Sequence, residues 1–157
     1  MKITSIKQQV KNTDRYSIFV EGKYVFSLSE GALIESKIHS GQELTAQQVS
    51  EFKKLSADDK LYNRALRYAA MRPRSRWEVT FYLERKQASP ALIDNILNRL
   101  SNIGLIDDLA FAKTFITNRQ LLRPSSRRKI FLELKQKRVD DKTIEEALAE
   151  STRDENA

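Results

Sequence analysis

Two similar stretches of fifteen residues, which begin 51 positions apart, constrain the fold of this chain more than any other feature. Residues 72–86 read RPRSRWEVTFYLERK, and residues 123–137 read RPSSRRKIFLELKQK. Aligned without gaps they share six residues (Arg, Pro, Ser, Arg, Leu and Lys). Segments that recur at a fixed period are typical of stacked repeats, in which each unit covers the apolar face of its neighbour. The sequence therefore predicts two equivalent units around one continuous core.

Capping residues and prolines predict three helices in the first copy. A helix that begins near Ser56 must end before Pro73, because proline cannot continue it. Ser75 and Glu78 then form an S-x-x-E capping box. Ser89 and Pro90 provide an N-cap and a first-turn proline for the third helix. The pattern predicts a compact three-helix unit.

The second copy follows the same plan. Asp107 or Asp108 caps its first helix, Ser126 precedes a helix over residues 127–138, and Asp140 or Asp141 caps the last helix. The adjacent pair Asp58-Asp59 is likewise interpreted as a helix cap, because acidic side chains accept the free N–H groups of a helix start.

The N-terminal quarter differs from the repeats. Residues 2–10 and 15–28 alternate polar and apolar side chains, which predicts antiparallel strands with a turn at Glu21-Gly22. Two short helices, capped by Ser29 and Thr45, are expected to cover this sheet. The predicted fold is mainly α. Its expected parts are an α+β module over 1–56, three-helix repeats over 57–106 and 107–150, and a polar tail over 151–157.

Charge is concentrated in the repeats. The chain has 157 residues and a net charge of +7, and residues 58–138 hold eighteen Lys and Arg against eight Asp and Glu. Such a field favours an anionic partner. Residues 139–157 have a net charge of −5 and are interpreted as a solvated segment.

The composition argues against an enzyme, a metal centre or a bound cofactor. There is no cysteine, the one histidine is His39, and four glycines leave no phosphate-binding loop. No run of eighteen apolar residues could cross a membrane, and the N-terminus alternates where a signal peptide would be apolar. We expect a cytoplasmic protein and a monomer.

Basic side chains flank the corresponding helix starts in both copies. Guanidinium groups suit phosphates and carboxylates alike, so these clusters leave nucleic acid and an acidic protein groove both open. Trp77 and Tyr82 could stack on bases or on a partner, although aromatic residues beside Phe81 at helical spacing are more typical of a core. The predicted binding residues are Arg72, Arg74, Arg76, Arg123, Arg127, Arg128, Lys129, Lys135 and Lys137.

Residues 58–149 resemble the RecX family of regulatory proteins. The most specific part is GLIDDLAFAKTFITNR at 104–119, followed by S-x-R-x-I-x-x-E-L at 126–134, where Arg128, Ile130, Glu133 and Leu134 fit. The opening RPRS and the N-terminal strands are also similar to the family. Members commonly continue into a third three-helix repeat, whereas this chain stops eight residues after Ala149.

The resemblance implies a non-enzymatic regulator of DNA recombination and repair. Such a protein would bind RecA filaments on single-stranded DNA, limit their growth, and bind DNA alone weakly and in a salt-sensitive way. A repeated basic unit suits a helical polymer, because it can contact successive equivalent subunits. The alternative is a stand-alone DNA-binding helical regulator that contacts phosphates through the same arginines.

Overall fold

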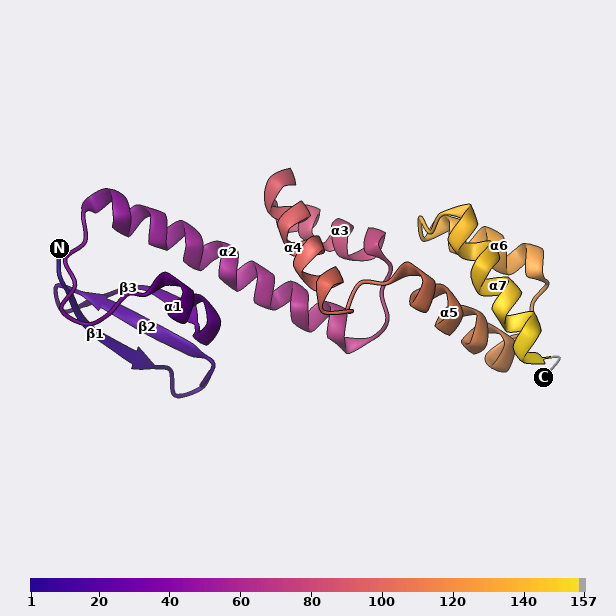
Figure 1. Cartoon of the computed structure of the whole chain (residues 1–157), viewed down its shortest axis with the longest axis horizontal. Helices are drawn as coiled ribbons and strands as arrows, with labels where there is room; N and C mark the ends of the chain where they lie inside the picture. The colour runs from indigo at the N-terminus through magenta and orange to yellow at the C-terminus, as the bar shows by residue number, and fades with distance from the viewer. Residues whose placement is uncertain (156–157) are drawn as a thin grey trace. The chain divides into compact units, whose positions relative to one another are not determined.

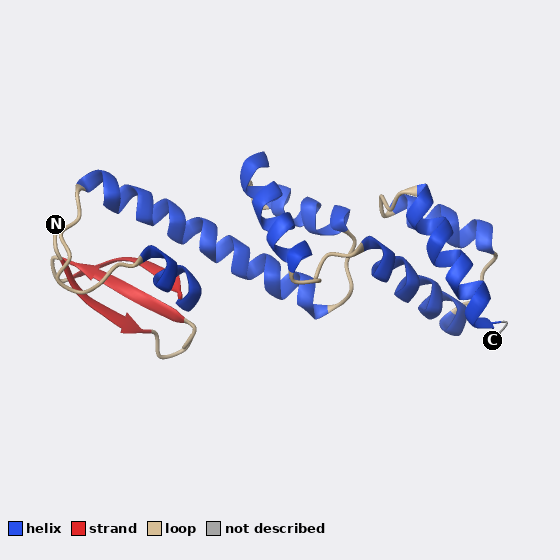
Figure 2. Cartoon of the chain, viewed as in Figure 1, coloured by secondary structure: helices blue, strands red, loops and turns tan. Residues whose placement is uncertain are grey.

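The computed structural model describes residues 1–155 as three strands and seven helices (Figures 1 and 2). The chain divides into two compact units, Met1–Arg64 and Ala65–Ala157. The elements are β1 (Ile3–Gln8), β2 (Arg15–Val20), β3 (Lys23–Ser29), α1 (Glu30–Ser36), α2 (Ala46–Met71), α3 (Arg76–Arg85), α4 (Pro90–Asn102), α5 (Asp108–Leu122), α6 (Arg127–Gln136) and α7 (Asp141–Glu155). This agrees with the predicted mainly α fold.

The N-terminal unit contains an antiparallel sheet in the order β1-β2-β3. Glu21 and Gly22 have φ angles of 51° and 79°, which give the two-residue turn predicted between β2 and β3. Ser29 caps α1 by accepting the N–H of Ala32. The apolar face of the sheet packs with residues of α2, including Phe52, whose ring stacks on Phe26 at 5.5 Å.

The predicted break at Ser56 is wrong, because α2 is one helix of 26 residues. Its start is the predicted one: Thr45 accepts the N–H of Gln48, and Gln48 accepts the N–H of Thr45. The hydroxyl of Ser56 donates to the Ser27 carbonyl oxygen at 2.5 Å. A serine whose side chain is bonded to the sheet does not compete for the helix backbone, so the helix continues through it.

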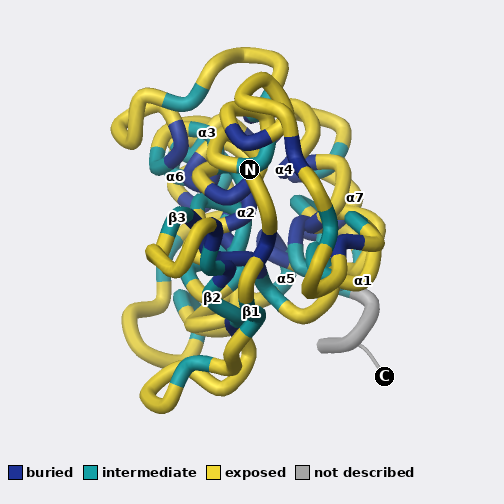
Figure 3. The backbone as a smooth tube through the Cα atoms, turned by 90° about the vertical axis from the view of Figure 1, so that its left-hand side faces the viewer, coloured by how far each residue is buried: buried dark blue, intermediate teal, exposed yellow. Residues whose placement is uncertain are grey.

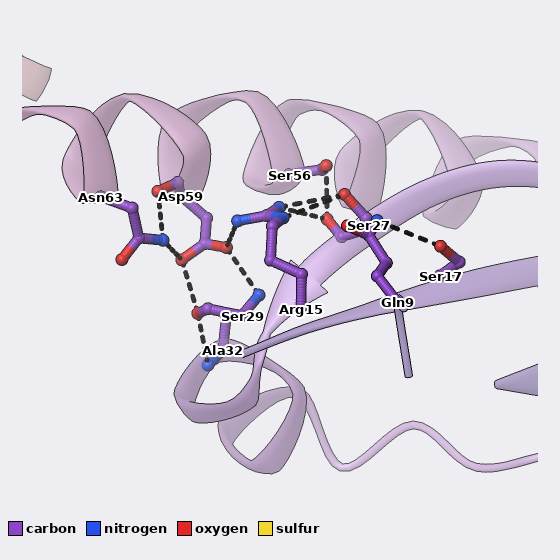
Figure 4. Close-up of polar contacts among 9 residues, drawn as sticks. All are labelled: Gln9, Arg15, Ser17, Ser27, Ser29, Ala32, Ser56, Asp59 and Asn63. Atoms are coloured by element: carbon purple, nitrogen blue, oxygen red, sulfur yellow. Dashed lines mark hydrogen bonds and ion pairs between the residues drawn. The ribbon is translucent and has the colours of Figure 1, made fainter. Parts of the chain in front are cut away.

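Asp59 is also not a helix cap but the centre of a buried polar network (Figure 4). Its carboxylate accepts Arg15 Nη1 at 3.1 Å, and the N–H and hydroxyl of Ser29, both at 2.8 Å. Arg15 also donates to the hydroxyl and carbonyl oxygens of Ser27. Arg15 and Asp59 are only 8% and 7% exposed. The network therefore fixes α2 to both β2 and β3.

The repeat is confirmed at its predicted offset. Ser75 and Ser126 cap α3 and α6, which are ten residues each. Both helices are followed by a residue in the left-handed region, Gln87 at φ 63° and Arg138 at φ 62°. Ser89 then caps α4, and Asp140 accepts the N–H of Thr143 at the start of α7. Each of these pairs is 51 residues apart.

The second repeat has a core of its own. Its nine buried residues are Phe111, Ala112, Ile116, Ile130, Leu134, Val139, Ile144, Ala147 and Leu148. All of them come from α5, α6, α7 and the α6–α7 link. The prediction of one core continuous across both repeats is therefore wrong. Figure 3 colours the buried parts of the chain dark blue.

The predicted boundaries at residues 56 and 150 fall inside helices. The first lies within α2, and the second lies within α7, which continues to Glu155. The segment interpreted as a polar tail is thus helical over 151–155, and its last two residues lie outside the described part. No helix among the described residues has the length and apolar composition that crossing a membrane requires.

Candidate partner-binding surface

Two of the predicted binding arginines, Arg72 and Arg74, form contacts within the first repeat, and of these only Arg74 is buried. Arg74 is 10% exposed at its side chain, donates to the Tyr68 carbonyl oxygen at 2.7 Å, and places its guanidinium carbon 3.5 Å from the centre of the Tyr68 ring. Arg72 donates to Glu78 at 2.8 Å. Glu78 itself completes the capping box of α3, since it accepts the N–H of Ser75. These contacts tie the α2–α3 loop to α3.

Arg76 remains exposed, and its backbone links the two repeats. Its N–H donates to the Asp108 carboxylate at 2.8 Å, across 32 residues of sequence. The cap of α5 is therefore Asp107, which accepts the N–H of Ala110, and Asp108 serves the start of α3. The sequence left the choice between the two aspartates open.

The pKa values of the Asp108 and Asp140 carboxyl groups are shifted in opposite directions. Burial raises the pKa of Asp108 more than the N–H and charge of Arg76 lower it. The N–H of Thr143 lowers the pKa of Asp140. The contribution of Asp108 to folding stability is therefore present below its unfolded pKa and is lost as pH rises through its folded pKa. The contribution of Asp140 is present above its unfolded pKa and is lost as pH falls through its folded pKa. A carboxyl-carbon NMR titration checks this. An Asp108 midpoint at or below that of Asp140 would contradict it.

The second basic cluster is only partly occupied by internal contacts. Arg127 donates to the Leu148 carbonyl oxygen at 3.3 Å and to the Thr152 hydroxyl, near the end of α7. Lys135 pairs with Asp141 at 2.6 Å. Lys137 is half-buried at the end of α6. Arg127 and Lys135 thus have partners within their own repeat, and Lys137 is partly covered by it.

Arg128 and Lys129 form the accessible part of this cluster, together with Arg123. All three are exposed. Within residues 1–152, whose side chains the structure describes, neither Arg128 nor Lys129 forms an ion pair. The first turn of α6 holds no acidic residue. We call Arg123, Arg128 and Lys129 the basic edge of the second repeat.

One pair of equivalent positions makes different contacts in the two repeats. In the first, the rings of Tyr68 and Tyr82 stack at 4.2 Å. At the positions 51 residues later, Arg119 pairs with Glu133. Tyr82 is thus a packing residue, which the sequence left open, and Glu133 has an internal partner.

Sequence reasoning missed the exposure of Trp77 and Phe81 on α3. Their helical spacing favours a core position, yet Trp77 is 37% and Phe81 48% exposed. The apolar residues of α3 that are buried in the core are Val79 and Leu83. Counting helical spacing from these two would have placed Trp77 and Phe81 outward.

Metal-ligand clusters and the one histidine were the remaining candidates for a reactive site among the described residues. They include no group of three His, Cys, Asp or Glu side chains that could hold a metal ion. His39 is exposed in a loop, with its Nδ1 3.1 Å from the Ser40 carbonyl oxygen.

Comparison with protein families matches three segments of the chain. The Regulatory protein RecX N-terminal domain matches residues 1–45. The first and second three-helix domains of RecX match residues 62–100 and 107–148.

Individual relatives and solved structures agree with these matches. The chain is 37% identical over 153 residues to the regulatory protein RecX of Lactobacillus delbrueckii subsp. bulgaricus and 34% identical over 147 residues to that of Bacillus subtilis. It spans 56% of the length of each. A crystal structure of regulatory protein RecX superposes with a TM-score of 0.84 at 28% identity, covering 95% of this chain and 73% of that one. RecX from Lactobacillus salivarius superposes with a TM-score of 0.56 at 30% identity, over 59% of this chain and 60% of that one.

Proposed function

Since this chain belongs to the RecX family of regulatory proteins, we propose that it binds the RecA recombinase filament on single-stranded DNA and inhibits its recombinase and ATPase activity. It would act in the cytoplasm without chemistry of its own, and so influence DNA recombination and repair. The binding partner and the inhibition are proposals drawn from the family resemblance and from the surface of the second repeat.

The observation that carries the proposal concerns the five residues that match the family motif at 126–134, because, among the described side chains, four of them have contacts inside the fold and one does not. Ser126 caps α6, Ile130 and Leu134 lie in the core, and Glu133 pairs with Arg119. Arg128 alone among these five is exposed without such a contact in the part of the chain whose side chains are described. An exposed arginine at a helix start suits a partner carboxylate or phosphate.

The repeated architecture supports a polymeric partner. Two three-helix units at a fixed offset can contact successive equivalent subunits, and the second contact then forms at a high effective concentration. The excess of Lys and Arg over residues 58–138 favours encounter with an anionic nucleoprotein.

A pull-down with RecA, with and without single-stranded DNA and nucleotide, tests the proposal. We expect retention of this chain by the assembled filament, and slower RecA-driven ATP hydrolysis and strand exchange in its presence. Lack of retention under every condition, together with unchanged hydrolysis, would refute the proposed function.

The double substitution Arg128→Ala and Lys129→Ala is expected to weaken inhibition of RecA-driven ATP hydrolysis by roughly ten-fold, since each exposed charge pair is worth about 0.2–1 kcal/mol. Arg127 is left in place because it contacts α7. The matched control is Lys53→Ala with Lys54→Ala, which removes the same charge from exposed positions of α2. Equal inhibition by the two folded variants would place the functional surface away from the basic edge.

A further inference from the structure

The outward side of α3 carries a short ladder of aromatic and guanidinium groups. Trp77, Phe81 and Arg85 are spaced four residues apart, so they follow one another along one side of the helix. The Trp77 and Phe81 rings lie 5.7 Å apart at 21° between their planes. The Arg85 guanidinium carbon lies 5.8 Å from the centre of the Phe81 ring. We call these three residues the aromatic ladder.

The side chains around the ladder are mainly basic. Arg76 precedes Trp77 and Lys86 follows Arg85, and both are exposed. Glu78 lies on the inner side of α3, where it is 8% exposed and bound to Arg72. Glu84 is the one exposed acid of the helix. A polyanion approaching the ladder would therefore meet an excess of positive charge.

The corresponding helix of the second repeat has no such ladder. The positions 51 residues after Trp77, Phe81 and Arg85 are Arg128, Leu132 and Gln136. Leu132 is 54% exposed, close to the 48% of Phe81. The two repeats thus present different chemistry at equivalent places, and only the first presents aromatic rings there.

We propose that the aromatic ladder is a binding site for unpaired bases of single-stranded nucleic acid. One or two bases would stack on the Trp77 and Phe81 rings, and Arg76 and Arg85 would bind the adjacent phosphates. Every base has a π face, so this contact is strong without reading sequence. The assignment goes beyond the proposed function, because it places the nucleic acid itself, and not RecA, on this face.

The combination of rings and charge favours a nucleic acid over an acidic protein. Charge alone would be enough to bind an acidic groove, and Arg128 and Lys129 of the second repeat provide such charge. Partly exposed, nearly parallel rings beside arginines instead match the stacking surfaces that hold single strands.

Trp77 is the only tryptophan of the chain and reports directly on the site. Its fluorescence would be followed during titration with a twenty-nucleotide oligo-dT at low salt. We expect saturable quenching, because a stacked base contacts the indole. An abasic oligonucleotide of the same length has the same phosphates without bases, and we expect it to bind at least five-fold more weakly and to quench little. Equal quenching by both would overturn the proposal.

Two matched variants test the ladder itself, each checked for folding by circular dichroism. Phe81→Ala should weaken oligo-dT binding by at least five-fold, because losing one base stack commonly costs that much or more. Leu132→Ala, at the equivalent half-exposed position, should bind like the parent. A Phe81→Ala variant that binds oligo-dT like the parent would overturn the proposal.

The RecA pull-down separates this inference from the proposed function. A chain that binds the filament but shows no base-dependent quenching refutes the nucleic-acid site alone. Base-dependent quenching without filament binding supports the site and counts against the proposed function. If Phe81→Ala loses filament binding while its oligo-dT affinity is unchanged, the ladder binds a protein and the proposal is wrong.

Discussion

Replacing Arg15 with alanine is expected to lower the free energy of unfolding of the N-terminal unit by about 3–5 kcal/mol, the usual cost of leaving one charge of a buried pair without its partner. Asp59 would keep its bonds from Ser29 but lose the guanidinium at 3.1 Å. Ser27 would lose its arginine donor as well. The effect is large because both charged groups are almost fully buried.

Urea unfolding followed by circular dichroism measures this change. Asp58→Ala is the matched control, since Asp58 precedes Asp59 on α2 and is less buried, and it should change stability by less than about 1 kcal/mol. The double change Arg15→Met with Asp59→Leu should be milder than Arg15→Ala, because it leaves no unpaired charge. An Arg15→Ala protein as stable as the parent would show that the network contributes little.

Arg74→Ala is expected to destabilise the repeat unit by about 2–3 kcal/mol, because a charged hydrogen bond and the packing of the guanidinium on Tyr68 are lost together. Glu78 would also lose one of its two arginine neighbours. This residue was predicted to bind a partner, so a loss of regulation on its replacement is expected to follow from a loss of folding.

Arg72→Ala gives the comparison for this second substitution. Its side chain is 53% exposed and pairs with the same carboxylate, so we expect a cost of at most about 1 kcal/mol. Thermal unfolding of the two variants side by side decides the matter. Equal midpoints would mean that the buried position of Arg74 contributes nothing beyond a surface ion pair.

Local signals predicted most of the fold correctly. Ser75 with Glu78, Ser89 with Pro90, and Glu21 with Gly22 act through contacts within four residues, so the sequence alone contains what fixes them. The break at Ser56 was predicted by the same logic and was wrong. There the deciding partner is Ser27, which is 29 residues away and brought close only by the sheet.

The candidate site was less predictable for the same reason. Seven Lys or Arg side chains look alike along residues 123–138, and only the fold shows that Arg127 contacts α7 and Lys135 contacts Asp141. The inward position of Arg74 depends on Tyr68 of the preceding helix. Composition indicates that a basic surface exists, whereas tertiary contacts decide which charges remain available.

The bond from the Arg76 N–H to Asp108 joins two residues that are synthesised at different times. During synthesis, Arg76 leaves the ribosome 32 residues ahead of the aspartate that serves it. At bacterial and eukaryotic elongation rates that interval is roughly 2–6 s, which is long compared with helix formation. Until Asp108 is synthesised, only the Ser75 cap and Glu78 are available to stabilise the start of α3, and the bond to α5 can form only afterwards.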